Sequence, residues 1–260
     1  MERRTFLGLG AAVPAAVALG ASATWAGTGP AHADPGPAAD LLWAADLSSA
    51  SDSYEAGFGN VQIQYEDGDI ENDGPGMPVV EHPLLGRALR ISLEERQTRY
   101  EARPGAAQDC GEGEDLYFRV DFVLPPDFPI DQDNPFCLVN QIHQGSDSGS
   151  PPVEFDVFDG NLSVRGDSDA YAEHLCPVAV DTVYSLVYRV GFSADPDSSL
   201  LEVWVNGEKL LSDFRPPCAT MNGGNSYWKG ATMYCSGSIP PLTVFQNAHR
   251  VGTTLESVTA

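Results

Sequence analysis

Three short segments carry polar side chains at every second position, and together they hold the residue types that acid–base chemistry requires. The segments are Arg99-Tyr100-Glu101-Ala102-Arg103, Gln141-Ile142-His143, and Tyr227-Trp228-Lys229 with Tyr234 close behind. On an extended strand, alternate side chains point to one face of the sheet. Arginine, glutamine, histidine, lysine and tyrosine side chains gathered on such faces can bind a carboxylate, neutralise its charge and move a proton beside it.

The stretches that must position these side chains have the pattern of short β-strands. Strand patterns cover residues 89–93, 115–124, 153–158, 161–165, 184–190, 200–205 and 208–211. The dipeptides Asp159-Gly160 and Asn206-Gly207 predict tight hairpin turns between neighbouring strands. Helical periodicity is nearly absent after residue 33. The sequence therefore predicts an all-β sandwich or jelly roll, whose curved sheets offer a concave substrate groove.

The first 33 residues have the pattern of a twin-arginine signal peptide. Arg3 and Arg4 precede an apolar, alanine-rich stretch, and Ala31-His32-Ala33 is a small-x-small cleavage site. We therefore expect residues 1–33 to be removed, residues 34–40 to form a flexible lead-in, and residues 41–260 to form one domain. This organisation predicts a secreted protein that is exported already folded and does not remain in a membrane.

The charge balance limits the classes of partner. Without Glu2, Arg3 and Arg4 the chain keeps 12 basic and 36 acidic residues, a net charge of −24. Such a charge argues against nucleic acid and anionic membranes as partners. The chain has only two lysines, Lys209 and Lys229, and the second lies in the third segment. A local concentration of cations in a cleft matters more for binding than the net charge, because salt screens exposed charges beyond ~10 Å.

All five cysteines lie after the signal segment, so an oxidising compartment predicts up to two disulfides and one odd thiol. Cys218 and Cys235 flank the third segment and are candidates to clamp it. The spacing of cysteines and histidines does not indicate a zinc site, and no cofactor is expected. The acidic stretches Asp131–Asn134 and Asp195–Asp197 are candidates for a structural calcium ion, although such stretches are usually solvated turns.

In these three segments the sequence resembles jelly-roll polysaccharide lyases, a group that includes alginate lyases, glucuronan lyases and heparin lyase I-like proteins. The family segments are R-x-E-x-R, Q-[IV]-H and Y-x-K-x-G-x-Y. The first two match fully, and the third matches Tyr227 and Lys229. The family tyrosine position then holds Met233, with Tyr234 one residue later. A bulge at Gly230 would restore Tyr234, and Tyr227 is the alternative tyrosine. The resemblance implies a single β-jelly-roll (concanavalin A-like) sandwich.

The resemblance also implies a reaction, β-elimination at a uronic acid in an acidic polysaccharide such as glucuronan, alginate or a glycosaminoglycan. The C5 proton is removed, and the glycosidic oxygen on C4 leaves. By resemblance, Arg99 and Gln141 bind the uronate carboxylate with Arg103 nearby. Tyr227, Lys229 and Glu101 belong to the binding site, and Glu101 holds the two arginines in place. Elimination needs no redox cofactor, and a secreted monomer is the expected state.

The catalytic base and acid are expected to be His143 and Tyr234. An imidazole titrates near neutrality, and a phenol near Lys229 and the arginines is expected to have a lowered pKa. In glucuronate or mannuronate the C5 hydrogen and the C4 oxygen lie on the same face, so one tyrosine can serve as both base and acid. In guluronate or iduronate they lie on opposite faces, so His143 would be the base and the tyrosine the acid. The sequence leaves both routes open.

Two other functions compete with the lyase. The stretch Glu154-Phe-Asp156-Val-Phe-Asp159 resembles the E-x-D-x-x-E segment of retaining β-glucanases, whose two catalytic carboxyl groups lie about 5 Å apart. Asp159 directly precedes Gly160, so we expect it in a hairpin turn. A non-catalytic carbohydrate-binding lectin could stack sugars on aromatic side chains. Its candidates are Trp204, Trp228 and Tyr171.

Each segment also has a purely structural interpretation. An R-x-E-x-R stripe is commonly a cross-strand ion-pair face, and a single strand histidine is usually structural. The co-occurrence and order of the three segments favour the lyase.

Overall fold

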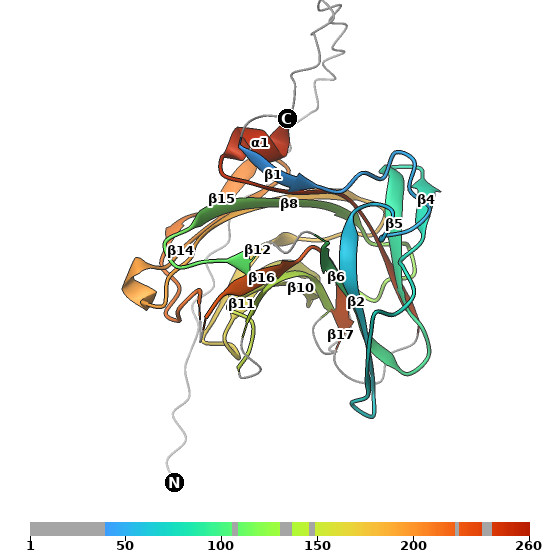
Figure 1. The fold of residues 1–260 in the computed structure, drawn as a ribbon, viewed down its shortest axis with the longest axis horizontal. Coiled ribbons are helices and arrows are strands. Elements are labelled where there is room, and N and C mark those ends of the chain that lie inside the picture. The colour runs from blue at the N-terminus through green and yellow to red at the C-terminus, as the bar shows by residue number, and fades with distance from the viewer. Residues whose placement is uncertain (1–39, 106–108, 131–136, 146–148, 222–223, 236–240) are drawn as a thin grey trace, which may run out of the picture. The chain divides into compact units, whose positions relative to one another are not determined.

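Figure 1 shows the computed structural model, in which two antiparallel β-sheets pack face to face. The structure describes residues 40–105, 109–130, 137–145, 149–221, 224–235 and 241–260. The expected signal peptide and nearly all of the expected lead-in lie outside these residues. The all-β sandwich expected from the strand patterns is confirmed.

The first sheet has eight strands among the described residues and lies uppermost in Figure 1. Its order is β15 (Glu208–Phe214), β14 (Leu200–Val205), β13 (Val183–Gly191), β8 (Asp115–Val123), β18 (Leu242–Gly252), β5 (Gly86–Leu93) and β4 (Val79–His82), with β1 (Leu41–Ala44) also paired to β18. Strand β8 alternates buried and half-exposed residues along most of its length. This alternation places one face of the sheet in the core.

The second sheet carries all three polar segments. Its order is β12 (Tyr171–Pro177), β11 (Asn161–Gly166), β10 (Val153–Phe158), β9 (Cys137–Gln144), β17 (Ala231–Cys235), β6 (Gln97–Pro104), β2 (Phe58–Tyr65) and β3 (Ile70–Asn72), and β16 (Ser226–Lys229) pairs with β9 and with β7 (Asp109–Cys110). Polar segments far apart in the sequence therefore lie on neighbouring strands.

The two predicted hairpin turns are confirmed. Asp159 and Gly160 both have positive φ (48° and 70°), and so do Asn206 and Gly207 (52° and 82°). Two positive φ values in a two-residue loop define the hairpin turn whose twist matches the flanking strands. The first turn sets the register of β10 against β11, so that Glu154 lies opposite Arg165.

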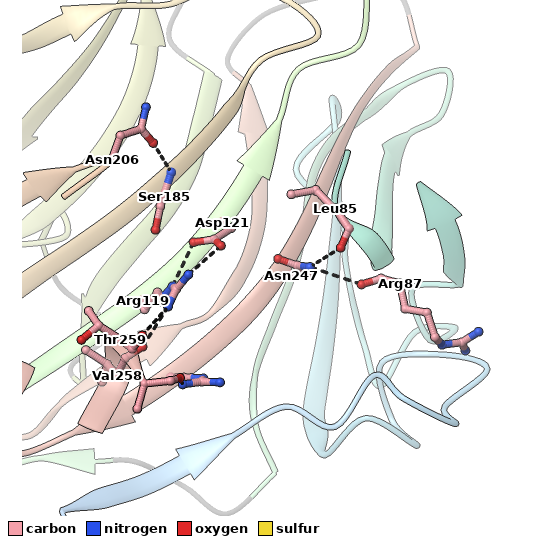
Figure 2. A network of polar contacts seen from close by, with 11 residues as sticks. Leu85, Arg87, Arg119, Asp121, Ser185, Asn206, Asn247, Val258 and Thr259 are labelled. Carbon is pink, nitrogen blue, oxygen red and sulfur yellow. Dashed lines mark hydrogen bonds and ion pairs between the residues drawn. The ribbon is translucent and has the colours of Figure 1, made fainter. Parts of the chain in front are cut away.

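The short C-terminal helix α1 (Leu255–Thr259) packs against the first sheet. Arg119 on β8 forms an ion pair with Asp121, 2.9 Å between Nη2 and Oδ2, and also donates to the carbonyls of Val258 and Thr259 (Figure 2). Those carbonyls belong to the last turn of the helix, where backbone acceptors lack partners within the helix. No helix within the described ranges has the length and apolar character needed to span a membrane. The only other helical segment described is a 3₁₀ turn, η1 (Pro196–Ser198).

One disulfide joins Cys137 on β9 to Cys235 on β17. The expected clamp between Cys218 and Cys235 is therefore wrong, because Cys218 is a free thiol. Cys137 and Cys235 face each other across neighbouring strands, which brings their side chains together. Sequence spacing could not identify this pair, since the two cysteines are 98 residues apart.

Replacing both members of this disulfide, Cys137→Ala with Cys235→Ala, should lower the free energy of unfolding by roughly 2–5 kcal/mol, because the unfolded chain regains the freedom of a long loop. Urea titration monitored by fluorescence measures the change. The matched control is Cys218→Ala, which removes a buried thiol outside any disulfide and should cost less than about 1 kcal/mol. Equal losses in the two proteins would show that Cys137 and Cys235 are not covalently joined.

Candidate active site

The first polar segment lies on β6, with its charged side chains on the face of the second sheet that points away from the core. Tyr100 and Ala102 are buried in the core between the sheets. Strand alternation therefore turns Arg99, Glu101 and Arg103 to the opposite face. We call this outward face of the second sheet the site face.

The second and third segments pair directly on the same face. Gln141 and His143 on β9 lie opposite Lys229 and Tyr227 on β16. The residue between Tyr227 and Lys229, Trp228, is fully buried in the core. The register therefore places the glutamine beside the lysine and the histidine beside the tyrosine.

Gly230 separates β16 from β17 and changes which residues face outward. Before it, Tyr227 and Lys229 are on the site face. After it, Met233 is buried in the core, and Tyr234 lies opposite Arg99 of β6. A side chain at Gly230 would lie 3.0–3.2 Å from the Trp228 ring, which is too close for ordinary packing. The interruption thus brings Tyr234, rather than Met233, to the site.

Buried Asn140 satisfies the backbone at this interruption. Its Nδ2 donates to the carbonyl of Gly230 at 2.8 Å, and its Oδ1 accepts from the Tyr188 hydroxyl at 2.6 Å and from Trp228 Nε1 at 2.9 Å. A buried carbonyl without a donor would be costly. The side chain of Asn140 therefore replaces the strand hydrogen bond that the break removes.

Glu101 is the centre of the polar cluster. Its carboxylate accepts from Lys229 Nζ at 2.5 Å and from Gln141 Nε2, and its Oε2 lies 3.4 Å from Arg99 Nε. Burial acts to raise the pKa of Glu101, but the charges of Lys229 and Arg99 hold it below its usual value. The group is therefore a carboxylate at neutral pH, and it fixes the positions of three neighbours.

His143 is held in one tautomer. Its Nδ1 lies 2.8 Å from the carbonyl oxygen of Gln144. A carbonyl only accepts, so Nδ1 carries the proton and Nε2 is left as the acceptor. Burial first, and then the charge of Lys229, lower the pKa of His143 below its ordinary value. The ring is neutral at neutral pH and can take up a proton at Nε2.

Two arginines contact the tyrosines of the cluster. The Arg99 guanidinium lies 4.3 Å from the centre of the Tyr234 ring, and the Arg103 guanidinium lies 4.8 Å from that of Tyr227. Tyr227 also stacks on His143, with ring centres 5.3 Å apart. Stacking of this kind restricts the orientation of both cations and of the imidazole.

Two adjoining cavities lie along the site face. One is lined by Asn60, Gln62, Asn72, Glu101, Ala102, Arg103, Tyr227 and Lys229. The other, of about 410 Å³, is lined by Arg99, Gln141, His143, Gly149, Ser150, Pro151, Glu154, Arg165, Ser168, Asp169 and Tyr234. The linings meet where Glu101 contacts Arg99 and Gln141. All eight site residues expected from the sequence thus border these cavities.

Sequence reasoning did not assign Arg165 and Asp169 to this site. Arg165 Nε lies 3.3 Å from a carboxylate oxygen of Glu154 and 3.3 Å from one of Asp156, and its Nη1 lies 3.2 Å from Asp169. The hairpin turn predicted at Asp159-Gly160 could have placed Arg165 in this site. A two-residue turn there sets Arg165 directly opposite Glu154.

The glucanase pairing of Glu154 with Asp159 does not form. Glu154 lies on the site face, whereas Asp159 occupies the hairpin turn five residues further along the strand, roughly 16 Å away. That separation far exceeds the spacing of two catalytic carboxyl groups.

The aromatic residues considered for a lectin are buried. Trp204, Trp228 and Tyr171 are 9%, 0% and 6% exposed. Trp228 and Tyr171 pack in the core between the sheets, and Trp204 packs in a smaller cluster with Val187 and Val258 under Lys209, so none of the three rings is open to a sugar.

The candidate calcium stretches receive no support as a metal site. Asp131–Asn134 falls outside the described residues. Asp195 caps the 3₁₀ turn Pro196–Ser198 by accepting a hydrogen bond from the Asp197 amide. Among the residues that the structure describes, no group of three or more His, Cys, Asp or Glu side chains is arranged to hold a metal ion.

Comparison with known proteins gave one family and several similar structures. Residues 50–248 match the family described as polysaccharide lyase. No curated protein matches the sequence.

The similar solved structures include an endo-β-1,4-glucuronan lyase from the fungus Trichoderma reesei, with 15% identity, 76% of this chain and 96% of that chain covered, and a TM-score of 0.53. Alginate lyase AlyC3 has 12% identity, 80% and 95% coverage, and a TM-score of 0.51. The catalytic domain of a glycoside hydrolase family 131 protein from Coprinopsis cinerea has 12% identity, 85% and 100% coverage, and a TM-score of 0.54. At such identities, structural similarity shows the fold alone.

Replacing Asn140 by leucine should lower the free energy of unfolding by roughly 2–4 kcal/mol, because buried donors and acceptors around Gly230 lose their partners. Activity per folded molecule should also fall, because the orientation of Tyr234 depends on this interruption. The control is Asn247→Leu on β18 of the first sheet, because the Asn247 amide donates to the Leu85 carbonyl in the turn between β4 and β5 at 2.7 Å (Figure 2). That variant should lose about 1 kcal/mol and keep its activity. Full activity in folded Asn140→Leu would contradict this role.

Proposed function

The chain belongs to the polysaccharide lyase family, and we propose that its substrate is a uronate-containing polysaccharide cleaved by β-elimination. One observation carries the proposal. Arg99, Gln141, His143 and Tyr234, drawn from three strands, line a single cavity. This set supplies a cation and an amide for a carboxylate, together with two groups able to move a proton.

Arg99 and Gln141 neutralise the uronate carboxylate in this proposal. The C5 proton is weakly acidic while that carboxylate is charged, because removing the proton adds further negative charge. Gln141 uses one N–H on Glu101, and its amide group has a second N–H to donate. Donors fixed before the reaction stabilise the enolate-like intermediate without reorganising. Glu101 and Lys229 act as positioning residues, because they engage each other at 2.5 Å.

His143 and Tyr234 provide the base and the acid. On a substrate whose C5 hydrogen and C4 oxygen lie on opposite faces, His143 Nε2 removes the C5 proton and the Tyr234 hydroxyl protonates the leaving C4 oxygen. On a substrate with both on one face, Tyr234 performs both transfers. Either route leaves a C4–C5 double bond in the product.

We also propose export through the twin-arginine pathway, on the basis of Arg3, Arg4 and the apolar stretch that follows them.

Incubation with glucuronan, alginate and a glycosaminoglycan tests the reaction directly. We expect ultraviolet absorbance from the unsaturated uronate to rise with at least one of the polymers. Tyr234→Phe should lower kcat by roughly 10²–10⁴-fold, as expected for loss of a general acid or base, and His143→Ala should do the same on a substrate for which His143 is the base. Reducing ends without that absorbance would indicate a hydrolase instead.

Matched controls separate catalysis from folding. His82→Ala on β4 and Tyr117→Phe on β8 change the same residue types in the other sheet and should leave kcat unchanged. Full activity of Tyr234→Phe would overturn the assignment of this tyrosine and leave Tyr227 as the candidate.

The pH profile offers a second test on a substrate for which His143 is the base. The base must be neutral, and partial burial together with the charge of Lys229 holds the pKa of His143 below its ordinary value of 6.5. Protonation removes activity as pH falls through the pKa in the folded protein, so the acid limb of kcat/KM should lie below pH 6.5. His82→Ala should leave that limb in place. An acid limb above pH 6.5 would assign the titration to another group.

A further inference from the structure

The charges along the site face differ between its two ends. Towards β2 and β3, the cavity holds Arg103 and Lys229 against the single carboxylate of Glu101. Arg103 contacts the Tyr227 ring, and among the described residues no carboxylate forms an ion pair with it. This end therefore presents a cation that is available to a carboxylate of a bound sugar.

The end towards β10 and β11 is acidic. Glu154, Asp156 and Asp169 surround one arginine, Arg165, at 3.2–3.3 Å. Among the described residues, three carboxyl groups contact this guanidinium, so Arg165 is not available as a fork for a substrate carboxylate. With every group ionised, these four side chains carry a net charge of about −2, since one cation offsets one of three anions.

This acidic end is continuous with the catalytic cluster. Glu154 lies directly across from Gln141 on the neighbouring strand, and both line the same cavity as Arg99, His143 and Tyr234. Neighbouring strands are roughly 5 Å apart, so Glu154 and Arg165 lie about one and two strand spacings beyond the residue assigned to the uronate carboxylate. One strand spacing is close to the repeat of one sugar ring, so a polymer that runs across the strands would place the sugar next to the reacting uronate over this cluster.

The acidic cluster is mostly shielded from solvent. Glu154 and Asp156 are 8% and 3% exposed, so their charges are poorly screened. Asp156 Oδ1 is buried and has no hydrogen-bond partner among the described residues. Asp169 is the exposed member, with 68% of its side chain accessible. A substrate carboxylate placed here would meet like charge without an available cation.

We propose that Glu154 and Asp169 select, in the subsite next to the reacting uronate, for a sugar that carries no free carboxylate. The preferred substrate is then a mixed polymer, in which a uronate adjoins a neutral or an amino sugar, rather than a polymer of uronates alone. This inference rests on the proposed lyase function and narrows its substrate class. The exclusion arises from repulsion, which is a common basis of specificity.

The selection has a dependence on pH. Burial raises the pKa of Glu154 to about 7 and that of Asp156 to about 6. Both lose their charge as pH falls through these values, so discrimination weakens in acid and strengthens above pH 7. The charged and titratable groups that face Glu154 are Asp156 on its own strand, Arg165 on β11 and Asp169 after it, His143 on β9, Arg99 and Glu101 on β6, and Tyr234 on β17.

Polymers that differ only in carboxylate content test the proposal. Glucuronan and alginate are each prepared intact and with about half of their carboxylates reduced to alcohols, which keeps the linkages. We expect kcat/KM, expressed per remaining uronate, to be about tenfold higher on a partly reduced polymer, the effect of one poorly screened like charge at a short distance.

Two variants should weaken the preference. At pH 8, where Glu154 is ionised, Glu154→Gln deletes the poorly screened charge and should raise kcat/KM on the intact polymer several-fold. Asp169→Asn deletes an exposed, better screened charge and should raise it by about twofold, and both variants should leave the value on the reduced polymer nearly unchanged. Asp169 is exposed, so its variant tests the proposal even if Glu154→Gln folds poorly. Glu81→Gln, an exposed glutamate of the first sheet, is the control and should change neither value.

The outcomes separate the two proposals. Equal or better cleavage of intact polymers by the wild-type protein would overturn the subsite selection and leave the lyase function standing. Binding of the same polymers to Tyr234→Phe is measured in parallel by calorimetry. Tighter binding of the reduced polymer without turnover by the wild-type protein would support the subsite and overturn the lyase function. Neither cleavage nor binding would overturn both.

Discussion

The hydrogen bonds of Asn140 to the interrupted strand at Gly230 are the constraint on which the site depends. A continuous strand from Tyr227 would point Met233 outward and bury Tyr234, because side chains alternate with a period of two. Breaking the strand releases backbone carbonyls in the core, and Asn140 donates to that of Gly230 at 2.8 Å. Trp228 and Tyr188 in turn satisfy the amide oxygen of Asn140. A wholly apolar core would leave this interruption without donors.

On the other face of the same sheet, one buried carboxylate organises the cations. Glu101 receives Lys229 and Gln141 and lies beside Arg99. Burial of several like charges would be unfavourable alone, and the carboxylate offsets that repulsion. The consequence is a division of roles, because Lys229 is engaged with Glu101, while Arg103 contacts the Tyr227 ring and forms no ion pair with a carboxylate among the described residues. A lysine in a binding segment is thus a support for its neighbours.

Local charge, rather than net charge, sets what the cavities can hold. A protein with far more acidic than basic residues still presents Arg99 and Arg103 on the site face. Its acidic character reappears in the same cavity at Glu154, Asp156 and Asp169, which gather around Arg165. The two ends of the site face therefore differ in sign over a few strand spacings. Such a difference can distinguish the sugars of a polymer by position, which uniform charge cannot do.

The amino-acid sequence predicted β5, β8, β10, β11, β13, β14 and β15, the two hairpin turns and the alternation of side chains within the polar segments, because these depend on local backbone geometry. It therefore predicted that Arg99, Glu101 and Arg103 share a face. It did not identify other strands, such as β2 and β18. The sequence could not determine the partner of Cys235, the engagement of Lys229 or the burial of Trp228. Those depend on which strands become neighbours and in which register, and contacts between residues far apart in the chain form only when the sheets close around the core. The orientation of Tyr234 depends on the local sequence and on the tertiary structure, because Gly230 permits the interruption of the strand and buried Asn140 stabilises it.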